Sequence, residues 1–428
     1  MNFKTFSLNP AVARGTTDAG YDTPTPIQEK AIPEVLKGRD VMGLAQTGTG
    51  KTAAFALPIL NRLMDGPRGR VGALIVAPTR ELAEQIHDAI KTLGRHTRLR
   101  SAVVYGGVGI NPQIQALKRA DIVVGCPGRL LDHLGRGTVD LSRLEVLVLD
   151  EADQMFDMGF FPDIRRIISH VPQKNRQTLL FSATMPKAIR GLANDVLNNP
   201  VTVQIGTTAP AETVSHALYP VAPHLKTALL MKLLGRTRTE SVLVFTRTKY
   251  RAKSLDQKLA KAGYRSTSLQ GNLSQGRRQA AMSGFRSGEF QILVATDIAA
   301  RGIDVSTISH VINFDIPATP EAYIHRIGRT GRAECSGEAF TLVTEEDTLM
   351  VKAINRAIGS TVEKRTLADF NYDAAPLGHG GKKVNRPARR PQPAGRRRAP
   401  QPGSRRRESK GAFAWLSPGK GQAVRRAQ

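Results

Sequence analysis

The sequence is poor in cysteine, in long apolar runs and in acidic residues, and each shortage excludes a class of protein. Only two cysteines, Cys126 and Cys335, occur in the 428 residues, so neither a disulfide framework nor the spacing of a zinc site is present. No run of about eighteen apolar residues occurs, and residues 1–20 contain no apolar stretch typical of a signal peptide. These absences predict a soluble protein with no membrane span, in the reducing environment of the cytoplasm.

The shortage of acids gives the chain a strong positive charge. Asp and Glu number 36 against 62 Lys and Arg, for a formal net charge of +26. Residues 376–428 hold 15 Lys or Arg and one acid, Glu408, so this segment carries +14 and the remainder +12. Its arginine triplets lie among Pro, Gly and Gln, which predicts a disordered tail that binds polyanions by counterion release. A tail that only aids solubility is the alternative, and Trp415 could stack on a base or contact a protein.

A segment rich in glycine and threonine, AQTGTGKT at 45–52, has the spacing of a phosphate-binding loop, with Ala45 in place of the leading glycine. In such a loop, backbone N–H groups converge on phosphate oxygens, and a helix beginning near Gly50 adds its free amides. Lys51 then reaches the β- and γ-phosphates, and the Thr52 hydroxyl ligates Mg²⁺. Taken alone, the segment could also be an ordinary turn. If the segment is a phosphate-binding loop, its residues are predicted to bind ATP: Ala45, Gln46, Thr47, Gly48, Thr49, Gly50, Lys51 and Thr52.

An acidic pair further along the chain favours the loop over the turn. Residues 144–149 form an apolar run with the length and β-branched content of a buried parallel strand, and Asp150 and Glu151 follow it directly. Ligands of doubly wound sheets bind at the carboxyl ends of the strands. We therefore expect Asp150 to hold Mg²⁺ and Glu151 to polarise the attacking water. A solvated acidic turn is the alternative, and the loop upstream disfavours it.

With residues 150–153 reading Asp-Glu-Ala-Asp, the chain resembles the DEAD-box RNA helicases over about residues 1–360, with the motifs in family order. Residues 20–28 are similar to the family's adenine-reading Q motif. The resemblance implies that Gln28 bonds the edge of adenine, since a Gln amide can donate and accept at once, and that Tyr21 stacks on its face. The wording of the motifs and the basic tail look most like the bacterial RhlE-type branch.

Further motifs resemble the segments with which the family holds the RNA sugar-phosphate backbone. The resemblance implies an RNA path lined by Arg80, Gly107, Gly128, Arg129, Arg247, Gly271, Arg278, Thr296 and Gly302. Cys126 departs from the family, which usually has threonine there, and a thiol is a poorer phosphate donor than a hydroxyl. Ser182 and Thr184 match the motif that couples hydrolysis to strand separation.

A basic segment at 325–332, HRIGRTGR, resembles the family's arginine-finger motif. The resemblance implies that Arg329 and Arg332 contact the γ-phosphate from a second domain, which makes hydrolysis conditional on closure. It also implies that Asp304 holds the ribose hydroxyl. The predicted catalytic set is Lys51, Asp150, Glu151, Arg329 and Arg332.

The length of 428 residues is too great for one core and predicts two or three domains. Strand-like runs alternate with helical stretches such as 81–93 and 185–197, which predicts an α/β fold with parallel sheets. By resemblance, we expect two tandem RecA-like domains. The expected bounds are an ATP-binding domain at 1–205, a linker at 206–215, a C-terminal domain at 216–370 and a basic, disordered RNA-binding tail at 371–428.

These observations predict an ATP-dependent RNA helicase, with ATP and Mg²⁺ as cofactors, that separates short RNA duplexes or remodels ribonucleoproteins such as ribosomal precursors or RNA-decay complexes. Its partners would be single-stranded RNA and short duplexes, recognised through the backbone with little base specificity. Two alternatives stay open. One is an ATP-gated RNA clamp or annealing chaperone with little unwinding, and the other is a DNA translocase, which the Q motif disfavours.

Overall fold

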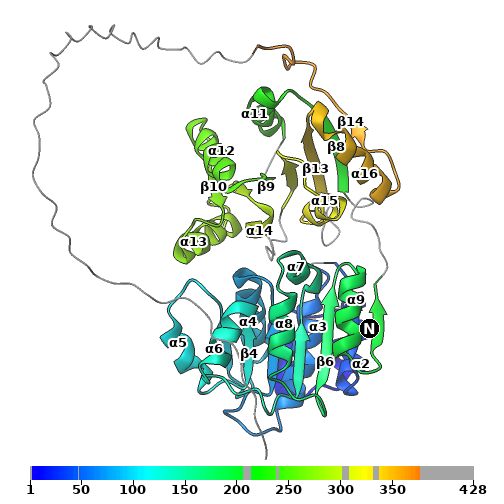
Figure 1. Ribbon diagram of the computed structural model, residues 1–428, viewed down its shortest axis with the longest axis vertical. Coiled ribbons are helices and arrows are strands. Elements are labelled where there is room, and N and C mark those ends of the chain that lie inside the picture. The colour runs from blue at the N-terminus through cyan, green and yellow to red at the C-terminus, as the bar shows by residue number, and fades with distance from the viewer. Residues whose placement is uncertain are drawn as a thin grey trace, which may run out of the picture. The chain divides into compact units, whose positions relative to one another are not determined.

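The computed structural model describes residues 2–46, 48–205, 214–237, 241–300, 308–330 and 337–375. Its helices and strands form two lobes, each built on a seven-stranded sheet. The first lobe consists of the described residues up to 205, and the second consists of those from 214 onward (Figure 1). Of the basic tail that the sequence predicts at 371–428, residues 376–428 lie outside the described residues.

The first sheet has the strand order β3-β4-β2-β5-β6-β1-β7. Neighbouring strands run parallel, and Val41 of β1 lies beside both Leu179 of β6 and Val201 of β7. The strands are β1 (Val41–Leu44), β2 (Ala73–Val76), β3 (Ser101–Val104), β4 (Ile122–Gly125), β5 (Val146–Leu149), β6 (Gln177–Ser182) and β7 (Val201–Gln204). The apolar run predicted at 144–149 thus becomes a strand in its last four residues.

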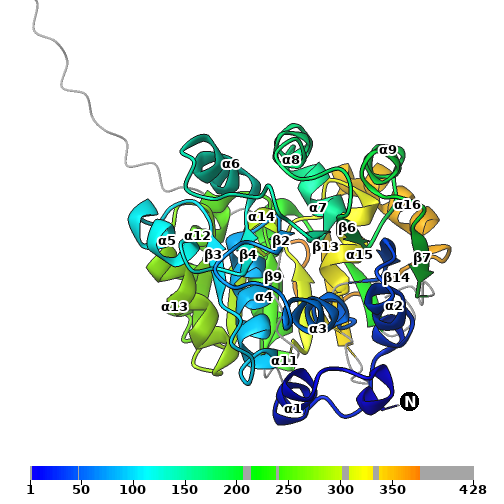
Figure 2. The same cartoon turned by 90° about the horizontal axis from the view of Figure 1, so that it is seen from below.

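Helices cover both faces of this sheet. The 3₁₀ helix η1 (Phe3–Phe6) precedes α1 (Pro10–Asp18), α2 (Pro26–Leu36), α3 (Lys51–Leu63), α4 (Arg80–Leu93), α5 (Ile110–Leu117), α6 (Pro127–Gly135), α7 (Ala152–Asp157), α8 (Phe161–Ile168) and α9 (Lys187–Val196). Helices α2, α3 and α4 lie on one face, and α6, α8 and α9 lie on the other (Figure 2). Each face therefore has its own apolar core.

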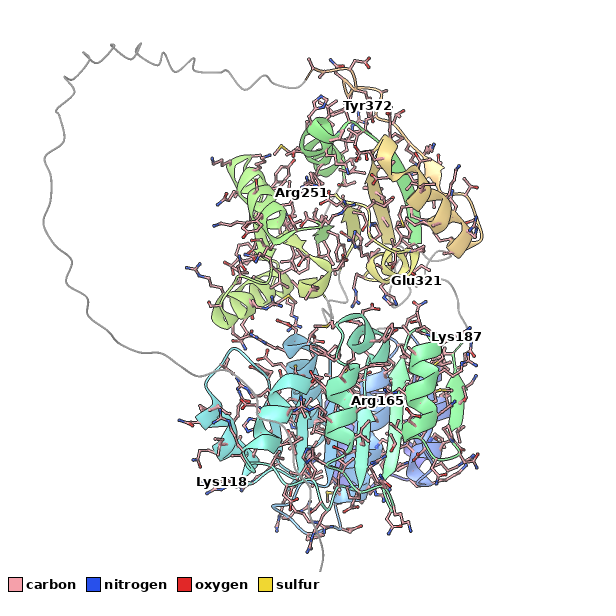
Figure 3. The ribbon with its side chains drawn as sticks, in the orientation of Figure 1. Lys118, Arg165, Lys187, Arg251, Glu321 and Tyr372 are labelled. Atoms are coloured by element: carbon pink, nitrogen blue, oxygen red, sulfur yellow. The ribbon has the colours of Figure 1, made fainter. Side chains whose placement is uncertain are left out.

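The division between core and surface follows the sequence pattern of each element. Residues 146–149 of β5 are buried throughout, as expected for a parallel strand covered on both faces. Exposed cations such as Lys118, Arg165 and Lys187 extend to solvent from the covering segments (Figure 3).

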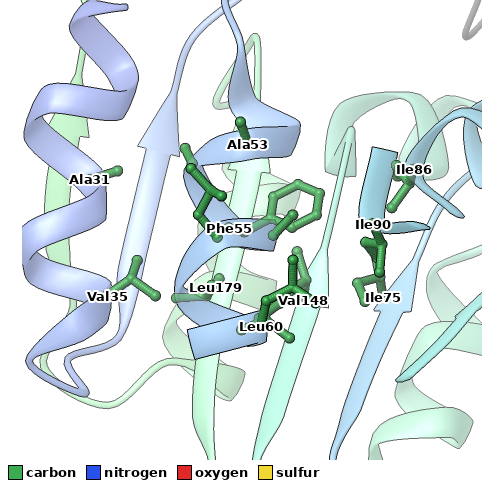
Figure 4. Packing of buried hydrophobic residues seen from close by; sticks show 14 of the residues in the cluster. Ala31, Val35, Ala53, Phe55, Leu60, Ile75, Ile86, Ile90, Val148 and Leu179 are labelled. Carbon is green, nitrogen blue, oxygen red and sulfur yellow. The ribbon is translucent and has the colours of Figure 1, made fainter. Parts of the chain in front are cut away.

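Helix α3 places Phe55 in the core, with its ring centroid 5.5 Å from that of Phe181 (Figure 4). Burial of a side chain this large stabilises the fold by about 1.5–3 kcal/mol.

The second sheet has the order β10-β11-β9-β12-β13-β8-β14, again with parallel neighbours. Its strands are β8 (Val214–Pro220), β9 (Val242–Phe245), β10 (Ser266–Leu269), β11 (Ile292–Ala295), β12 (His310–Asn313), β13 (Gly337–Val343) and β14 (Glu363–Lys364). Its helices are η2 (Pro223–Leu225), α11 (Lys226–Arg236), α12 (Lys249–Lys261), α13 (Gln275–Arg286), α14 (Asp297–Ala300), α15 (Pro320–Ile327), η3 (Glu345–Asp347) and α16 (Thr348–Ile358). Two parallel α/β sheets in tandem confirm the predicted fold class.

Some described residues lie where the sequence predicts a linker or a tail. Strand β8 begins at Val214, inside the predicted linker at 206–215. Phe370, Tyr372 and Ala374 pack against the core beneath α11 and α12, and the Tyr372 hydroxyl accepts from the backbone N–H of Leu367 at 3.0 Å. Residues 371–375 are therefore part of the second lobe.

Threonine caps fix where three of the helices begin. The hydroxyls of Thr79, Thr248 and Thr319 accept from the backbone N–H three residues later, at 3.3, 3.2 and 3.1 Å. Such a cap stabilises a helix by about 1 kcal/mol. The caps hold α4, α12 and α15 at the carboxyl edges of their sheets, where the predicted site residues lie. In the part of the chain that is described, every helix is too short or too polar to cross a bilayer.

Candidate functional site

The loop between β1 and α3 depends on two left-handed glycines. Gly48 and Gly50 have φ values of 83° and 91°, a region that favours glycine. A Cβ on Gly50 would lie 2.5 Å from the Gln28 amide nitrogen, so a larger residue would have to displace that side chain. Lys51 begins α3, and its buried Nζ donates to the Ala45 carbonyl at 2.8 Å. The ammonium group therefore lies within the loop.

The segment predicted to read adenine braces this loop. The Gln28 side-chain oxygen accepts from the backbone N–H of Thr25 at 2.9 Å, and its amide nitrogen donates to the Gly50 carbonyl at 3.0 Å. The Thr25 hydroxyl donates to the Thr49 carbonyl at 2.7 Å. Thr47 lies outside the described residues. The roles of Gln28 and Tyr21 toward adenine stay predictions, while the bracing of the loop by Gln28 is observed.

The acidic pair lies at the carboxyl end of β5, close to the loop. Asp150 is buried, and burial raises the pKa of its carboxyl group, with the field of Lys51 opposing that shift and Glu151 adding to it. Glu151 adopts a left-handed backbone with φ 51° and ψ 53°, which is rare outside glycine. The site therefore concentrates two carboxylates in a dry environment that favours a cationic neighbour.

The last acid of the 150–153 segment joins the pair to the coupling motif. Asp153 Oδ2 accepts from the backbone N–H groups of Ala183 and Thr184, at 3.0 and 2.9 Å. The Ser182 hydroxyl accepts from the backbone N–H of Asp153 at 3.2 Å and donates to the Thr184 carbonyl at 2.7 Å. The same carboxylate lies 4.0 Å from Nε2 of His325 on α15. Ser182 and Thr184 are thus bonded to the acidic segment, although their coupling role stays a prediction.

The second lobe has two buried arginines at helix α15, Arg326 within the helix and Arg329 two residues beyond its end. Arg326 makes a bidentate ion pair with Asp297, at 2.5 and 2.7 Å, and its guanidinium lies 4.9 Å from the Phe245 ring centroid. Arg329 is 5% exposed and lines a small cavity with His325. Arg326 therefore holds α15 in place. The other predicted nucleotide contacts of this lobe, Asp304 and Arg332, lie outside the described residues.

Most of the predicted RNA-binding residues converge on one cavity of about 710 Å³. Its lining draws on loops that follow strands of both sheets and includes Arg80, Gly128, Arg129, Arg247, Gly271, Arg278 and Thr296. Gly106 lines the cavity in place of the predicted Gly107, and Gly302 lies outside the described residues. Segments far apart in the sequence thus form a single groove with several cationic side chains.

Gly107 has a role beside the cavity that the sequence did not indicate. Its φ is 82°, and a Cβ there would lie 2.2 Å from Nη1 of Arg80. The absence of a side chain lets Arg80 reach the amide oxygen of Gln275 at 3.2 Å. Nearby, Arg278 forms an ion pair with Glu81 at 2.6 Å. The predicted cations are therefore held in place by neutral and acidic partners.

Cys126 also lines this cavity and caps α6 without a side-chain hydrogen bond. Burial raises the pKa of its thiol to about 12, and the field of Glu81 adds to that shift. A protonated thiol is a weak donor, which agrees with the expectation of a poorer phosphate contact at this position.

Asp153, His325 and Glu81 belong to these networks, but the sequence-based site omitted them. The sequence could have indicated Asp153, because it is the last residue of the Asp-Glu-Ala-Asp motif at 150–153. The sequence indicated His325 more weakly, because it is the first residue of the basic segment at 325–332. The sequence did not indicate the role of Glu81, because Glu81 pairs with Arg278, which is 197 residues away along the chain.

A loop with a buried lysine, an acidic pair at a strand end and a buried arginine on a second parallel-sheet lobe define a two-lobed nucleoside-triphosphate hydrolase of the helicase class. Residues 25–192 match the DEAD/DEAH box helicase family, and residues 225–334 match the helicase conserved C-terminal domain. The chain belongs to the DEAD-box family and is an ATP-dependent RNA helicase.

Curated relatives agree with this assignment. The chain is 44% identical over 372 residues to the DEAD-box ATP-dependent RNA helicase RhpA of Helicobacter pylori, which covers 86% of this chain and 75% of that protein. It is 44% identical over 366 residues to the DEAD-box ATP-dependent RNA helicase CshA of Geobacillus kaustophilus, covering 85% of this chain and 78% of that protein.

Solved structures are similar as well. The Dbp5 protein of S. cerevisiae bound to RNA and ADP BeF3 has a TM-score of 0.77 at 32% identity, covering 85% of this chain and 95% of that one. A DEAD box protein from the hyperthermophile Methanococcus jannaschii has a TM-score of 0.52 at 37% identity, covering 86% and 99%. The fold and the family assignment therefore rest on independent comparisons.

Proposed function

We propose that the loop at 45–52 binds the ATP phosphates and that Glu151 orients the attacking water. Lys51 would neutralise charge on the β- and γ-phosphates, because its ammonium already lies inside the loop at 2.8 Å from the Ala45 carbonyl. Arg329 and Arg332 would supply guanidinium groups from the second lobe and make hydrolysis depend on closure. Tyr21, Gln28 and Asp304 would hold the adenosine.

The residues around Asp150 fit a magnesium ion. In the described residues, no group of three or more His, Cys, Asp or Glu is placed to hold a metal by itself. Mg²⁺ in nucleotide sites is usually held by one or two protein oxygens together with substrate phosphates, so a larger cluster is not required. Thr52 and Asp150 would be its protein ligands. The ion would supply charge neutralisation, and the raised pKa of the buried Asp150 carboxyl agrees with a site that favours a cation.

We propose that the 710 Å³ cavity holds the sugar-phosphate backbone of single-stranded RNA or of one strand of a short duplex. The observation that carries this proposal is the convergence of arginines, glycines and Thr296 from loops of both sheets on one cavity. Because such residues read backbone and not base edges, binding would depend little on sequence. Hydrolysis and release would then separate a short duplex or remodel a ribonucleoprotein.

Several finer assignments are also proposals. We place the protein in the cytoplasm and in the RhlE-type branch, on the wording of its motifs and its basic tail. Ribosomal precursors and RNA-decay complexes are candidate targets. An ATP-gated clamp or annealing chaperone is the second candidate function, and the tail charge of +14 favours it because a cationic segment holds RNA without unwinding it.

Turnover measurements separate these functions. We expect ATP hydrolysis by the full chain to rise on addition of single-stranded RNA and to stay near its basal rate with DNA. Unwinding of a duplex of about ten base pairs under the same conditions would favour the helicase role over the clamp. Equal stimulation by RNA and DNA would contradict the proposed RNA specificity.

A further inference from the structure

The two sheets repeat one strand order, so each strand of the second lobe has a counterpart in the first. Strand β8 lies between β13 and β14, just as β1 lies between β6 and β7, and each leads into a helix. Both helices begin with Lys-Thr, as Lys51-Thr52 in α3 and Lys226-Thr227 in α11. The ATP loop therefore has a positional counterpart at the carboxyl end of β8.

A cavity of about 700 Å³ opens at this counterpart position. Its lining residues follow strands β8, β9, β12 and β13 and include Tyr250, the cations Lys226, Arg247, Arg251 and Lys258, and the acids Asp315, Glu346 and Asp347. The volume falls within the range of small-molecule sites. The carboxyl edge of a parallel sheet is also where such folds bind their ligands.

The cavity differs from the ATP loop in a way that limits its ligand. Residues 221–225 contain no glycine, so the backbone cannot converge on phosphates as it does around Gly48 and Gly50. The buried Nζ of Lys226 donates to the carbonyls of Phe314 and Leu342, both at 3.1 Å, and burial lowers the pKa of this ammonium. The site is therefore not built to grip a triphosphate through its loop.

Positive charge is supplied instead by the segment after β9. Arg251, labelled in Figure 3, reaches from α12 to the buried Asp315 and forms an ion pair with it. Lys258 is exposed two turns further along α12, and Arg247 is exposed just before that helix. Because Asp315 already pairs with Arg251, and Glu346 and Asp347 add negative charge to the lining, the cations suited to bind a phosphate are the exposed Arg247 and Lys258.

Tyr250 adds an aromatic surface to these cations. Its side chain is 71% exposed, although large apolar side chains are mostly buried elsewhere in the lobe. The Lys249 ammonium lies 5.3 Å from the centroid of its ring. An exposed aromatic ring among cations is the arrangement on which nucleic-acid bases stack. Arg247 lines both this cavity and the 710 Å³ groove, so the two adjoin.

We infer that this second-lobe cavity binds one phosphorylated nucleoside, with the base stacked on Tyr250 and the phosphate bound by the cations of the lining. The nucleoside is either free or a residue of the RNA strand in the neighbouring groove, because Arg247 faces both. The cavity thus extends the RNA path beyond the proposed backbone contacts or serves a separate nucleotide.

Photocrosslinking of the full chain distinguishes the two sources. One arm uses a single-stranded 12-mer that contains 4-thiouridine, and the other uses 8-azidoadenosine monophosphate. Peptide mapping then reads adducts on residues 247–258 separately from those on the loop at 45–52. The Lys258→Ala variant keeps Tyr250, so the ring can still be crosslinked by the probe. Lys253→Ala is a matched control, because Lys253 is exposed on the same helix but does not line the cavity.

We expect adducts on residues 247–258, reduced about tenfold in Lys258→Ala and unchanged in Lys253→Ala, since one charge-assisted phosphate contact is typically worth about a tenfold change in affinity. Labelling by the 12-mer assigns the nucleoside to RNA, and labelling by the azido nucleotide assigns a free ligand. No adduct on 247–258 with either probe, or equal adducts in both variants, would overturn the inference. RNA-stimulated ATP turnover of the same preparation tests the proposed helicase roles independently, so that failure of the cavity and failure of those roles are distinguishable.

Discussion

At the scale of single residues, the backbone of Glu151 is the clearest departure from ordinary geometry. A left-handed conformation costs a non-glycine residue about 1–2 kcal/mol. The carboxylate pair at 150–151 is thereby turned sharply at the end of β5, where α7 begins. Strain of this kind persists where the surrounding fold determines it, and it often coincides with function.

Replacement of Glu151 by glutamine tests its proposed role. The amide keeps the size of the side chain but cannot polarise water as a carboxylate does, so we expect turnover to fall by about two orders of magnitude or more while ATP still binds. Steady-state hydrolysis and nucleotide binding by the purified variant measure both effects. Glu145→Gln is the control, because Glu145 lies at the opposite end of β5 and pairs with Arg62 and Arg70. Hydrolysis near the wild-type rate in Glu151→Gln would contradict the assignment.

The Cys126 thiol should react slowly with thiol reagents. Its pKa, raised to about 12 mainly by burial, leaves a thiolate fraction at pH 8 about 10³-fold below that of an ordinary cysteine. Because the thiolate is the reactive form, the labelling rate should rise about tenfold per pH unit up to at least pH 10. The rate is measured in a Cys335→Ser variant, with labelling in denaturant as the control. A plateau near pH 9 in the native protein would contradict the raised pKa.

At the scale of elements, the turn after β3 shows how a missing side chain places a cation. Gly107→Ala would put a Cβ 2.2 Å from Arg80 and impose a φ of 82° on alanine. We expect a loss of about 1–2 kcal/mol in unfolding free energy and weaker RNA binding, because Arg80 must move. Chemical denaturation and RNA titration measure the two effects.

Gly106→Ala is the matched comparison for that substitution. A Cβ there would meet nothing closer than Arg80 Nη2 at 3.8 Å, so its unfolding free energy should change by less than about 0.5 kcal/mol. Equal destabilisation in the two variants would show that the close approach of Gly107 to Arg80 has no energetic consequence.

The elements themselves were predictable because their signals are local. The apolar run before Asp150 and the helical pattern at 81–93 each depend on neighbouring residues, and both became the expected element within two residues. The networks of the site were not predictable. The bonds from Gln28 to Gly50 and from Asp153 to Thr184 join segments whose proximity is decided by packing of the whole sheet. Composition and spacing contain no information on such contacts.

At the scale of the whole molecule, hydrolysis should depend on an arginine of the second lobe. Arg329→Ala should lower RNA-stimulated turnover by about 10³-fold or more, as expected for loss of an arginine finger. Basal turnover without RNA should fall much less, because closure is driven by RNA. Arg356→Ala is the control, since Arg356 is exposed on α16. An equal loss in basal and stimulated rates would contradict conditional closure.

The tail should contribute affinity for RNA without contributing to catalysis. Truncation after Ala375 removes a segment of charge +14 and keeps the residues packed on the second lobe. We expect turnover at saturating RNA to persist and the RNA concentration required to rise. If about five tail cations contact phosphates, the slope of log affinity against log salt should flatten by roughly 3 to 4. An identical slope in the two proteins would show that the tail does not contact RNA.

The place of β1 in the first sheet has a consequence for biosynthesis. Val41 lies beside Leu179 and Val201, so the strand that leads into the ATP loop has no partner until a segment 138 residues later has been made. At 5–20 residues per second, that interval lasts roughly 7 to 28 s on the ribosome. During this time the nascent chain presents an unpaired apolar strand, and nucleotide cannot stabilise the lobe. Ribosome-bound chains should therefore acquire ATP binding abruptly, only after β7 has left the exit tunnel.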